Sequence, residues 1–318
     1  MVENRKSRKV VVVGAGAVGS TFAYALAQRG LAEEIVLIDA NHDLAEAQAL
    51  DLAHGAPYYP STQIRAGEKE DYADARVIVI TAGTKQAPGE SRLALLKRNS
   101  GIIESIVDEI TGEGSHAILL VTSNPVDVLT DVALKRSGWT KGRVIGSGTV
   151  LDSARFRYLL SQHCGVDVSN VHAYILGEHG DSEFPAWSMT NVAGVSIDDY
   201  CPLCNKCKNW QAEREKIVRT VKESAYHIIN YKGATYFAIG MALVRIVGAI
   251  LQDQRSVLPV STLLEGEYGL QDVCLGVPSV IGQGGVSEIV EAPLSPNEIE
   301  ALRNSARILQ SALKELKE

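Results

Sequence analysis

A histidine, an aspartate and two arginines are the side chains of this sequence best suited to acid–base chemistry on a small anion. His179, in the sequence GEHG at 177–180, titrates near neutral pH and can pass a proton. Asp152 and Arg155 are three residues apart, so on a helix they share a face. A carboxylate there can orient an imidazole, and a guanidinium can hold an anion in bidentate fashion. Arg92 ends a polar loop and could stabilise negative charge when that loop closes. Taken singly, these are a surface histidine, an exposed ion pair and a solvated arginine.

The polar loop that leads to Arg92 directly follows an apolar, strand-like run at 76–80. It begins with Thr81, Ala82 and Gly83 and carries the uncharged amide Gln86. Open α/β sheets bind their ligands at strand ends of this kind. The small residues would let the backbone pass close beneath a ligand, although Gly83 alone is also typical of an ordinary strand-exit turn.

A glycine-rich turn near the start of the chain predicts a nucleotide site. A valine strand leads into Gly14, Gly16 and Gly19 at the spacing G-x-G-x-x-G, and a helix begins at Val18, which we also place against the nucleotide. The glycines allow a tight turn, approach to a pyrophosphate and close helix–strand contact, and the helix N-terminus offers N–H groups to phosphates. The spacing alone is weak. However, Asp39 ends the next apolar run, where it can bind ribose hydroxyls and repel a 2′-phosphate. We therefore predict NAD as the cofactor.

The elements that position these residues form two regions. In the first, predicted strands at 10–13, 35–38, 76–80, 117–121 and 143–145 alternate with predicted helices at 18–29, 43–54, 92–109 and 125–137. This alternation predicts an α/β fold with a doubly wound parallel (Rossmann) sheet. The second region has predicted helices at 151–162, 211–230 and from 296 onward, and β-rich segments at 171–176, 257–264 and 273–281. We predict an NAD-binding domain at 8–148 and an α+β substrate domain at 149–318, with a helix near 234–251 packing back toward the first domain.

Bulk properties narrow the class of protein. The 318 residues are enough for two packed lobes, and 46% hydrophobic with 22% charged residues is ordinary for a globular protein. The net charge is −7 and no basic block stands out, which argues against nucleic acid as a partner. Two apolar stretches imitate an export signal (10–27) and a membrane span (234–251). The first contains the glycine turn and the second is interrupted by Arg245, so we predict a cytoplasmic protein without membrane partner.

Cys201, Cys204 and Cys207 form a C-x-x-C-x-x-C motif. A closed zinc site needs four ligands. Cys164 or Cys274 could supply the fourth, but nothing in the sequence places either nearby. We therefore favour a surface turn with reduced cysteines and predict no metal.

Taken together, the motifs resemble the lactate/malate dehydrogenase family, most closely its bacterial L-lactate dehydrogenases. They follow in order from residue 9 to about 281 and comprise the glycine turn with Asp39, TAG at 81–83, GESR at 89–92, SNPVD at 123–127, LDSAR at 151–155 and GEHGD at 177–181. The resemblance implies reversible hydride transfer between NADH and pyruvate, giving L-lactate and NAD⁺. His179 would exchange the proton, Asp152 would fix its tautomer, Arg155 would clamp the substrate carboxylate and Arg92 would polarise the carbonyl.

Three further positions gain a role only from this resemblance. Asn124 would orient the substrate oxygen and contact the cofactor, although an Asn before Pro is often only a turn former. Thr235 would line the substrate pocket. Gln86 would face the variable end of the substrate, where an uncharged amide cannot offset the desolvation of the second carboxylate of oxaloacetate. Gln86 therefore favours pyruvate, unless it is a solvent-facing loop amide.

The resemblance also implies an effector and an assembly. Arg157 and His172 match positions that bind fructose 1,6-bisphosphate between subunits in activated bacterial members, and the family implies a homo-oligomer, usually a tetramer. A pair of ordinary surface basic residues is nearly as good an interpretation. The rival functions are a malate dehydrogenase, which Gln86 disfavours, and a non-catalytic NAD-binding protein, which would not need a His–Asp pair. A metal-dependent hydrolase would leave the nucleotide motif unexplained.

Overall fold

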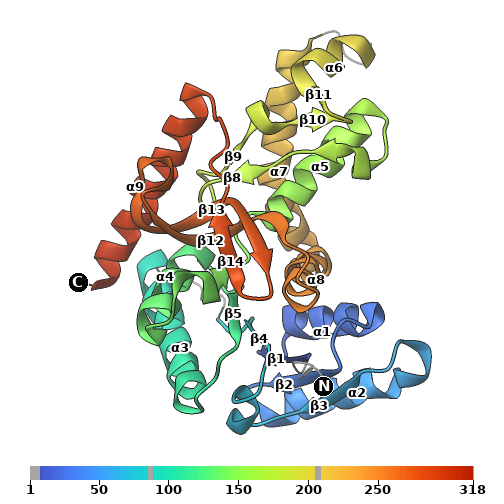
Figure 1. Cartoon of the computed structure of the whole chain (residues 1–318), viewed down its shortest axis with the longest axis vertical. Coiled ribbons are helices and arrows are strands. Elements are labelled where there is room, and N and C mark those ends of the chain that lie inside the picture. Colours follow the sequence, from blue (N-terminus) through green and yellow to red (C-terminus); the bar gives the residue numbers. More distant parts are fainter. Residues whose placement is uncertain (1–7, 85–88, 90, 205–208, 318) are drawn as a thin grey trace, which may run out of the picture.

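A twisted sheet runs through the middle of the molecule, with helices on both of its faces and a smaller lobe at one end (Figure 1). The computed structural model describes residues 8–84, 89, 91–204 and 209–317. The strands of its first half are β1 (Lys9–Val13), β2 (Glu34–Ile38), β3 (Gln63–Ala66), β4 (Val77–Ile80), β5 (Ile118–Val121) and β6 (Val144–Gly146). The helices between them are α1 (Ala17–Arg29), α2 (His42–His54), α3 (Arg92–Gly112) and α4 (Val126–Ser137).

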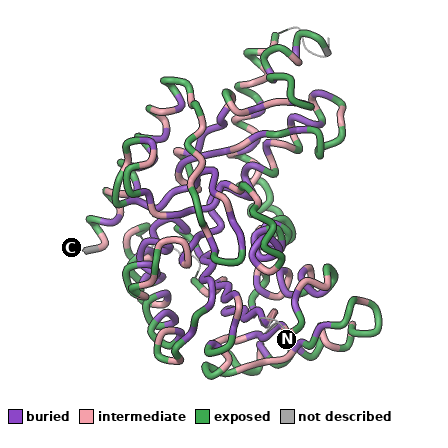
Figure 2. The backbone as a smooth tube through the Cα atoms, in the orientation of Figure 1, coloured by how far each residue is buried: buried purple, intermediate pink, exposed green. Residues whose placement is uncertain are grey.

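These six strands are parallel, in the order β3-β2-β1-β4-β5-β6. Side chains of a strand point alternately to its two faces. Val11 and Val13 accordingly pack in one core with α3, α4 and α9 (Pro296–Lys317), whereas Val10 and Val12 pack in a second core with α1, α2 and α8 (Phe237–Leu251). The central strands β1, β4, β5 and β6 are buried at every residue, whereas the edge strand β3 is only partly buried (Figure 2). The predicted doubly wound sheet is confirmed, and β3 is a strand that the sequence analysis did not identify.

Three antiparallel strands from the second half extend the same sheet. They are β12 (Ser256–Glu265), β13 (Gln271–Gly282) and β14 (Gly285–Ile289). β12 joins the parallel part beside β6, where Ser261 lies opposite Gly146. The predicted boundary at 148/149 falls between β6 and α5 (Val150–Cys164). The chain therefore leaves the sheet after Gly146 and returns to it at Ser256, which helps to join the two halves.

The smaller lobe consists of α5, α6 (Ile197–Cys204), α7 (Trp210–Lys232) and short strands (Figure 1, upper right). The strands are β7 (Val171–His172), β8 (Ile175–Leu176), β9 (Phe184–Pro185), β10 (Asn191–Val192) and β11 (Val195–Ser196). Phe156 and Leu160 of α5 pack with Ile217 and Val221 of α7 in a third core. The run at 171–176 was predicted as one strand, but β7 pairs with β10 and β8 pairs with β9, so it serves two sheets.

The apolar stretch at 234–251 forms α8, a helix whose side chains are largely buried and which packs against α1. Its one charged residue, Arg245, binds the Ser256 hydroxyl at 2.9 Å. In the described ranges no helix combines the length and the apolar character that a bilayer crossing requires.

Cys201 differs from the predicted surface turn. It lies in α6 and is buried, with its Sγ 3.4 Å from Nε2 of His163 on α5. Cys207 and the side chain of Cys204 lie outside the described residues. Among the residues that are described, the two clusters of three metal-type side chains contain no cysteine.

Candidate active site

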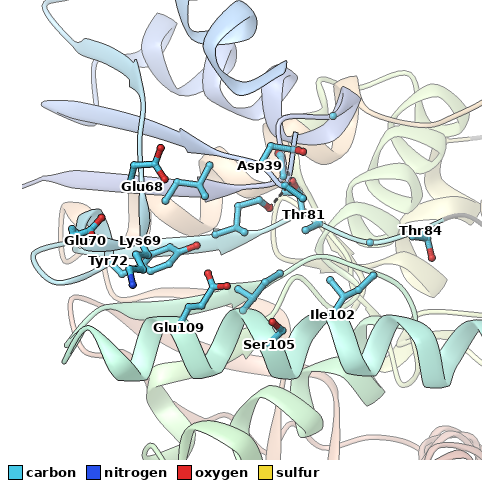
Figure 3. A pocket seen from close by; sticks show the side chains of 18 residues that line it. Asp39, Glu68, Lys69, Glu70, Tyr72, Thr81, Thr84, Ile102, Ser105 and Glu109 are labelled. Atoms are coloured by element: carbon cyan, nitrogen blue, oxygen red, sulfur yellow. Dashed lines mark hydrogen bonds between the residues drawn. The ribbon is translucent and has the colours of Figure 1, made fainter. Parts of the chain in front are cut away.

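A cavity of about 850 Å³ opens where β1, β2 and β4 end above α3 (Figure 3). Six of the residues predicted to bind the cofactor line it, namely Gly14, Gly16, Asp39, Thr81, Ala82 and Gly83. Strand ends of a parallel sheet meet at one edge, which is why residues distant in the sequence gather here. Ile102 and Ile106 of α3 also line the cavity, and Ile102 lies across it from the strand ends (Figure 3).

The glycine turn has the geometry that its spacing predicts. Gly14 has φ +106°, a conformation that favours glycine, and its N–H donates to the Ile38 carbonyl at 2.7 Å. A Cβ on Gly19 would lie 1.9 Å from the Gly14 carbonyl oxygen, whereas a Cβ on Gly16 would meet open space. Gly16 therefore leaves room on the cavity side. Gly19 and its neighbour Val18 lie on α1 outside the cavity lining, so Gly19 acts by packing.

Asp39 braces this turn and makes one end of the cavity acidic. Its Oδ2 accepts a hydrogen bond from the Ala15 N–H at 2.7 Å, and its Oδ1 accepts one from the Asn41 N–H at 2.9 Å. Glu68, Glu70 and Glu109 also line the cavity (Figure 3), against the single cation Lys69 among its described lining residues. This charge balance disfavours an extra phosphate on the ribose. The first turn of α1 contains no acidic residue, so its free N–H groups remain suited to a diphosphate.

Asn99 connects α3 to the two strand-end segments, and the sequence analysis did not identify it. Its Oδ1 accepts the Thr84 N–H at 3.0 Å, and its Nδ2 donates to the backbone carbonyl of Asn124 at 3.0 Å. Asn99 is buried although it is polar. Asn124 itself is exposed and follows β5, at the same edge of the sheet as Thr84. The only signal in the sequence was an amide on the apolar face of a helix.

The structure brings His179 and Asp152 together. Nδ1 of His179 donates to Oδ2 of Asp152 at 2.6 Å, and the other carboxylate oxygen of Asp152 accepts a hydrogen bond from Arg155. Asp152 lies in the first turn of α5 and is buried, whereas the His179 side chain is 28% exposed. The imidazole can therefore meet a ligand on its free side while Asp152 fixes its orientation.

Electrostatics favour the charged forms of both groups. Burial alone would lower the pKa of His179, but the neighbouring Asp152 carboxylate outweighs burial and raises this pKa to about 9. Burial alone would raise the pKa of Asp152, but His179 and Arg155 hold it below its ordinary value. At neutral pH the pair is therefore an imidazolium beside a carboxylate, ready to donate a proton.

Asp127 holds the backbone of the same histidine, and it too was missed by the sequence analysis as an individual residue. It lies in the first turn of α4, and its Oδ2 accepts the His179 N–H at 2.8 Å. Burial raises the pKa of Asp127 to about 6. Through this bond the segment after β5 is connected directly to the histidine loop.

The remaining predicted substrate residues are only partly assembled. Arg155 and Thr235 line one cavity of about 330 Å³ between α5, the end of α7 and the start of α8. Arg92 is exposed at the first position of α3, and within the described residues no hydrogen bond or ion pair joins it to His179 or Asp152. Gln86 lies outside the described residues.

Arg157 and His172, the predicted effector residues, lie on two neighbouring elements of the small lobe, α5 and β7. Nε of Arg157 donates to the backbone carbonyl of Val171 at 2.9 Å, directly before His172 in β7. The His172 residue is exposed and Arg157 is half-buried. Part of the Arg157 guanidinium is thus already used to hold α5 against β7.

Comparison with known proteins agrees with this geometry. The family model of the lactate/malate dehydrogenase NAD-binding domain matches residues 8–146, and that of the lactate/malate dehydrogenase α/β C-terminal domain matches residues 149–318. The chain is 56% identical to the L-lactate dehydrogenase of Treponema denticola over 98% of its own length and 99% of the relative's. It is 51% identical to that of Acetivibrio thermocellus over 99% of each chain.

Solved structures give the same result. A lactate dehydrogenase from a Medee basin deep-sea metagenome library is 47% identical with a TM-score of 0.96, covering 98% of this chain and 100% of the other. The ligands-bound form of the minor L-lactate dehydrogenase of Enterococcus mundtii is 43% identical with a TM-score of 0.94, covering 97% and 98%. The fold and the nucleotide cavity thus define an NAD-dependent dehydrogenase. Within that class, the chain belongs to the lactate/malate dehydrogenase family.

Proposed function

We propose that this protein is an L-lactate dehydrogenase that reduces pyruvate with NADH and runs in reverse with lactate and NAD⁺. The observation that carries the proposal is the 2.6 Å contact between His179 and Asp152, with Arg155 on the same carboxylate. The relatives from Treponema denticola and Acetivibrio thermocellus, L-lactate dehydrogenases 56% and 51% identical to this chain, support the same reaction.

In this proposal His179 is the proton donor for pyruvate reduction. The glycine turn, Asp39 and residues 81–83 would hold NADH in the 850 Å³ cavity, where it would supply the hydride for the carbonyl carbon. The imidazolium of His179 gives its Nε2 proton to the carbonyl oxygen, while its Nδ1–H stays bonded to Asp152. The neutral imidazole that remains is the base that accepts the hydroxyl proton of lactate in the reverse direction. Pyruvate, NADH and one proton thus give lactate and NAD⁺.

Arg155 is proposed to hold the substrate carboxylate. One of its terminal nitrogens binds Asp152, and the guanidinium offers further N–H donors to a ligand in the cavity that it shares with Thr235. Arg92 would add its charge near the carbonyl oxygen when the substrate is present, and Asn124 would bind substrate and cofactor at the end of β5. The NAD site would comprise the glycine turn, Asp39 and residues 81–83, with Gly19 and Val18 supporting it from α1.

Gln86 is the residue on which we base the choice of pyruvate over oxaloacetate. The test is the rate of NADH oxidation with each substrate, for the unmodified protein and for Gln86→Arg. We expect pyruvate to be preferred by the unmodified protein, and the arginine to shift the preference toward oxaloacetate because it can pair with the second carboxylate. Faster reduction of oxaloacetate by the unmodified protein would favour the rival function, a malate dehydrogenase.

Regulation by fructose 1,6-bisphosphate in a homotetramer is the finer part of this proposal. The neighbouring positions of Arg157 and exposed His172 support it, because two such pairs across a twofold axis would form a cationic pocket when the histidines are protonated. We expect fructose 1,6-bisphosphate to lower the KM for pyruvate at mildly acidic pH, and Arg157→Gln to abolish this effect. An unchanged saturation curve with the effector present would contradict it. The cytoplasmic location predicted from the sequence belongs to the same proposal.

A further inference from the structure

Glu183 places a third carboxyl group beside the His179–Asp152 pair. It stands four residues after His179, directly before β9, and is only 6% exposed. One of its carboxyl oxygens lies within 4.8 Å of a ring nitrogen of His179 and of a carboxylate oxygen of Asp152. Within the described part of the chain this carboxyl group has no hydrogen-bond partner and no ion pair. Burial without a hydrogen-bond partner or an ion pair strongly disfavours the charged form of a carboxyl group.

The charges around Glu183 come from three elements. Asp152 on α5 repels a charge on Glu183, whereas Arg155 of the same helix, Lys222 of α7 and His179 itself attract it. The net result, dominated by burial, raises the pKa of Glu183 to about 8. Helix α9, which packs on β9, contributes the uncharged hydroxyl of Ser305 to this loop.

We propose that Glu183 is a positioning residue of the acid–base site, whose carboxylate, once ionised, holds the imidazole of His179 in its protonated form. At neutral pH burial keeps this carboxyl largely uncharged, so Asp152 and Asp127 are the anions that face the imidazolium. As the pH rises, Glu183 ionises and His179 loses its proton in the same alkaline range, and the two groups lie close enough to affect each other. The added negative charge then opposes that loss, because opposite charges at this distance favour each other's charged forms.

The catalytic consequence rests on the proposed function. Reduction of pyruvate needs the protonated imidazole, so Glu183 would extend the pH range of pyruvate reduction toward alkaline pH. Oxidation of lactate needs the neutral imidazole, so Glu183 would shift the increase in the rate of lactate oxidation to higher pH. The residue thus sets the pH range over which the enzyme favours reduction, without touching the substrate.

The direct test is the titration of His179 in the ligand-free protein, followed by NMR with labelled histidine. His179→Gln assigns the signal. We expect Glu183→Gln, which imitates the uncharged carboxyl, to lower the midpoint of His179 by about one pH unit. Glu178→Gln is the matched control, because it removes a carboxylate adjacent to His179 in the chain, one that already accepts a hydrogen bond from the Ser182 hydroxyl. An unchanged midpoint in Glu183→Gln, or an equal shift in Glu178→Gln, would overturn the proposal.

A second variant and a second readout separate the possible failures. Glu183→Met offers a similar uncharged shape if Glu183→Gln does not fold, and the same downward shift is expected of it. In kinetics, the alkaline limit of pyruvate reduction should move down with the NMR midpoint. A downward NMR shift in a protein that does not reduce pyruvate would refute the proposed reaction and leave the role of Glu183 on His179 established. If the protein reduces pyruvate but the NMR midpoint of His179 is the same with and without the Glu183 substitutions, only the role of Glu183 is refuted.

Discussion

The Asp152 carboxylate binds His179 with one oxygen and Arg155 with the other. One buried anion at the start of α5 therefore orients both the group that we assign to proton transfer and the group that we assign to substrate binding. This arrangement keeps the imidazolium and the guanidinium at a fixed separation, as a reaction on a small 2-oxo acid requires. It also makes the two functions depend on one side chain.

Replacing His179 by glutamine should abolish proton transfer and leave cofactor binding intact. A glutamine has no titrating group, so kcat for pyruvate reduction should fall by about 10² to 10⁴-fold, the usual contribution of a general acid. NADH affinity, measured by fluorescence titration, should not change, because His179 does not line the nucleotide cavity. Retention of most of the activity would remove His179 from the mechanism.

Gly19→Ala should weaken NADH binding and lower the melting temperature. The new Cβ would lie 1.9 Å from the carbonyl oxygen of Gly14, so the turn beside the cavity must move. Gly101→Ala is the control, because Gly101 lies within α3 where a Cβ meets open space. That change should leave NADH binding intact and stabilise the protein by up to about 1 kcal/mol. Equal effects of the two substitutions would contradict the packing role of Gly19.

Asp39→Asn should relax the preference for NADH over NADPH. The amide oxygen can still accept the Ala15 N–H, but the negative charge that repels a 2′-phosphate is lost. We expect the KM for NADPH to fall roughly tenfold, equivalent to about 1.4 kcal/mol. Asp43→Asn removes an exposed charge from the first turn of α2 and should leave the KM unchanged. An unaltered KM in Asp39→Asn would assign the discrimination to the neighbouring glutamates.

The buried Asp127 should make the stability of the protein depend on pH. Its pKa is about 6 in the folded protein, against an ordinary value near 3.9 when unfolded, so the folded state binds the proton more tightly. This contribution is fully present below about pH 4 and is lost as the pH rises through about 6. Relative to Asp127→Asn, the unmodified protein should therefore lose about 2–3 kcal/mol of unfolding free energy over this range, measured by urea unfolding. Parallel curves for the two proteins would exclude the effect.

Local spacing was enough to predict much of the fold and of the nucleotide site. The roles of Gly14 and Gly19 follow from a turn of six residues, and the valines of β1 identify a strand covered on both faces. The order of Asp152 and Arg155 on α5 likewise follows from helical periodicity. Such features depend on residues close in sequence, so they can be predicted from a single sequence.

Features that depend on distant residues and belong to no motif could not be predicted. The pairing of Ser261 with Gly146 is set by the packing of whole strands, and no local pattern indicates that β12 continues the first sheet. Cys201 is buried because α6 places its side chain against His163 of α5, and α6 was not predicted. Asn99 and Glu183 matter through contacts across the fold, and neither has a motif of its own.

The most direct test of the account is the pH dependence of kcat/KM for pyruvate reduction, measured for the unmodified protein and for Asp152→Asn. The carboxylate of Asp152 overcomes the effect of burial and raises the pKa of His179 to about 9, so the unmodified protein should keep its activity through neutral pH and lose it as the pH rises through about 9. Without that charge the loss should move down by about one pH unit or more, and kcat should fall as well. An alkaline limit at the same pH in both proteins would contradict the claim that the His179–Asp152 pair is the proton donor.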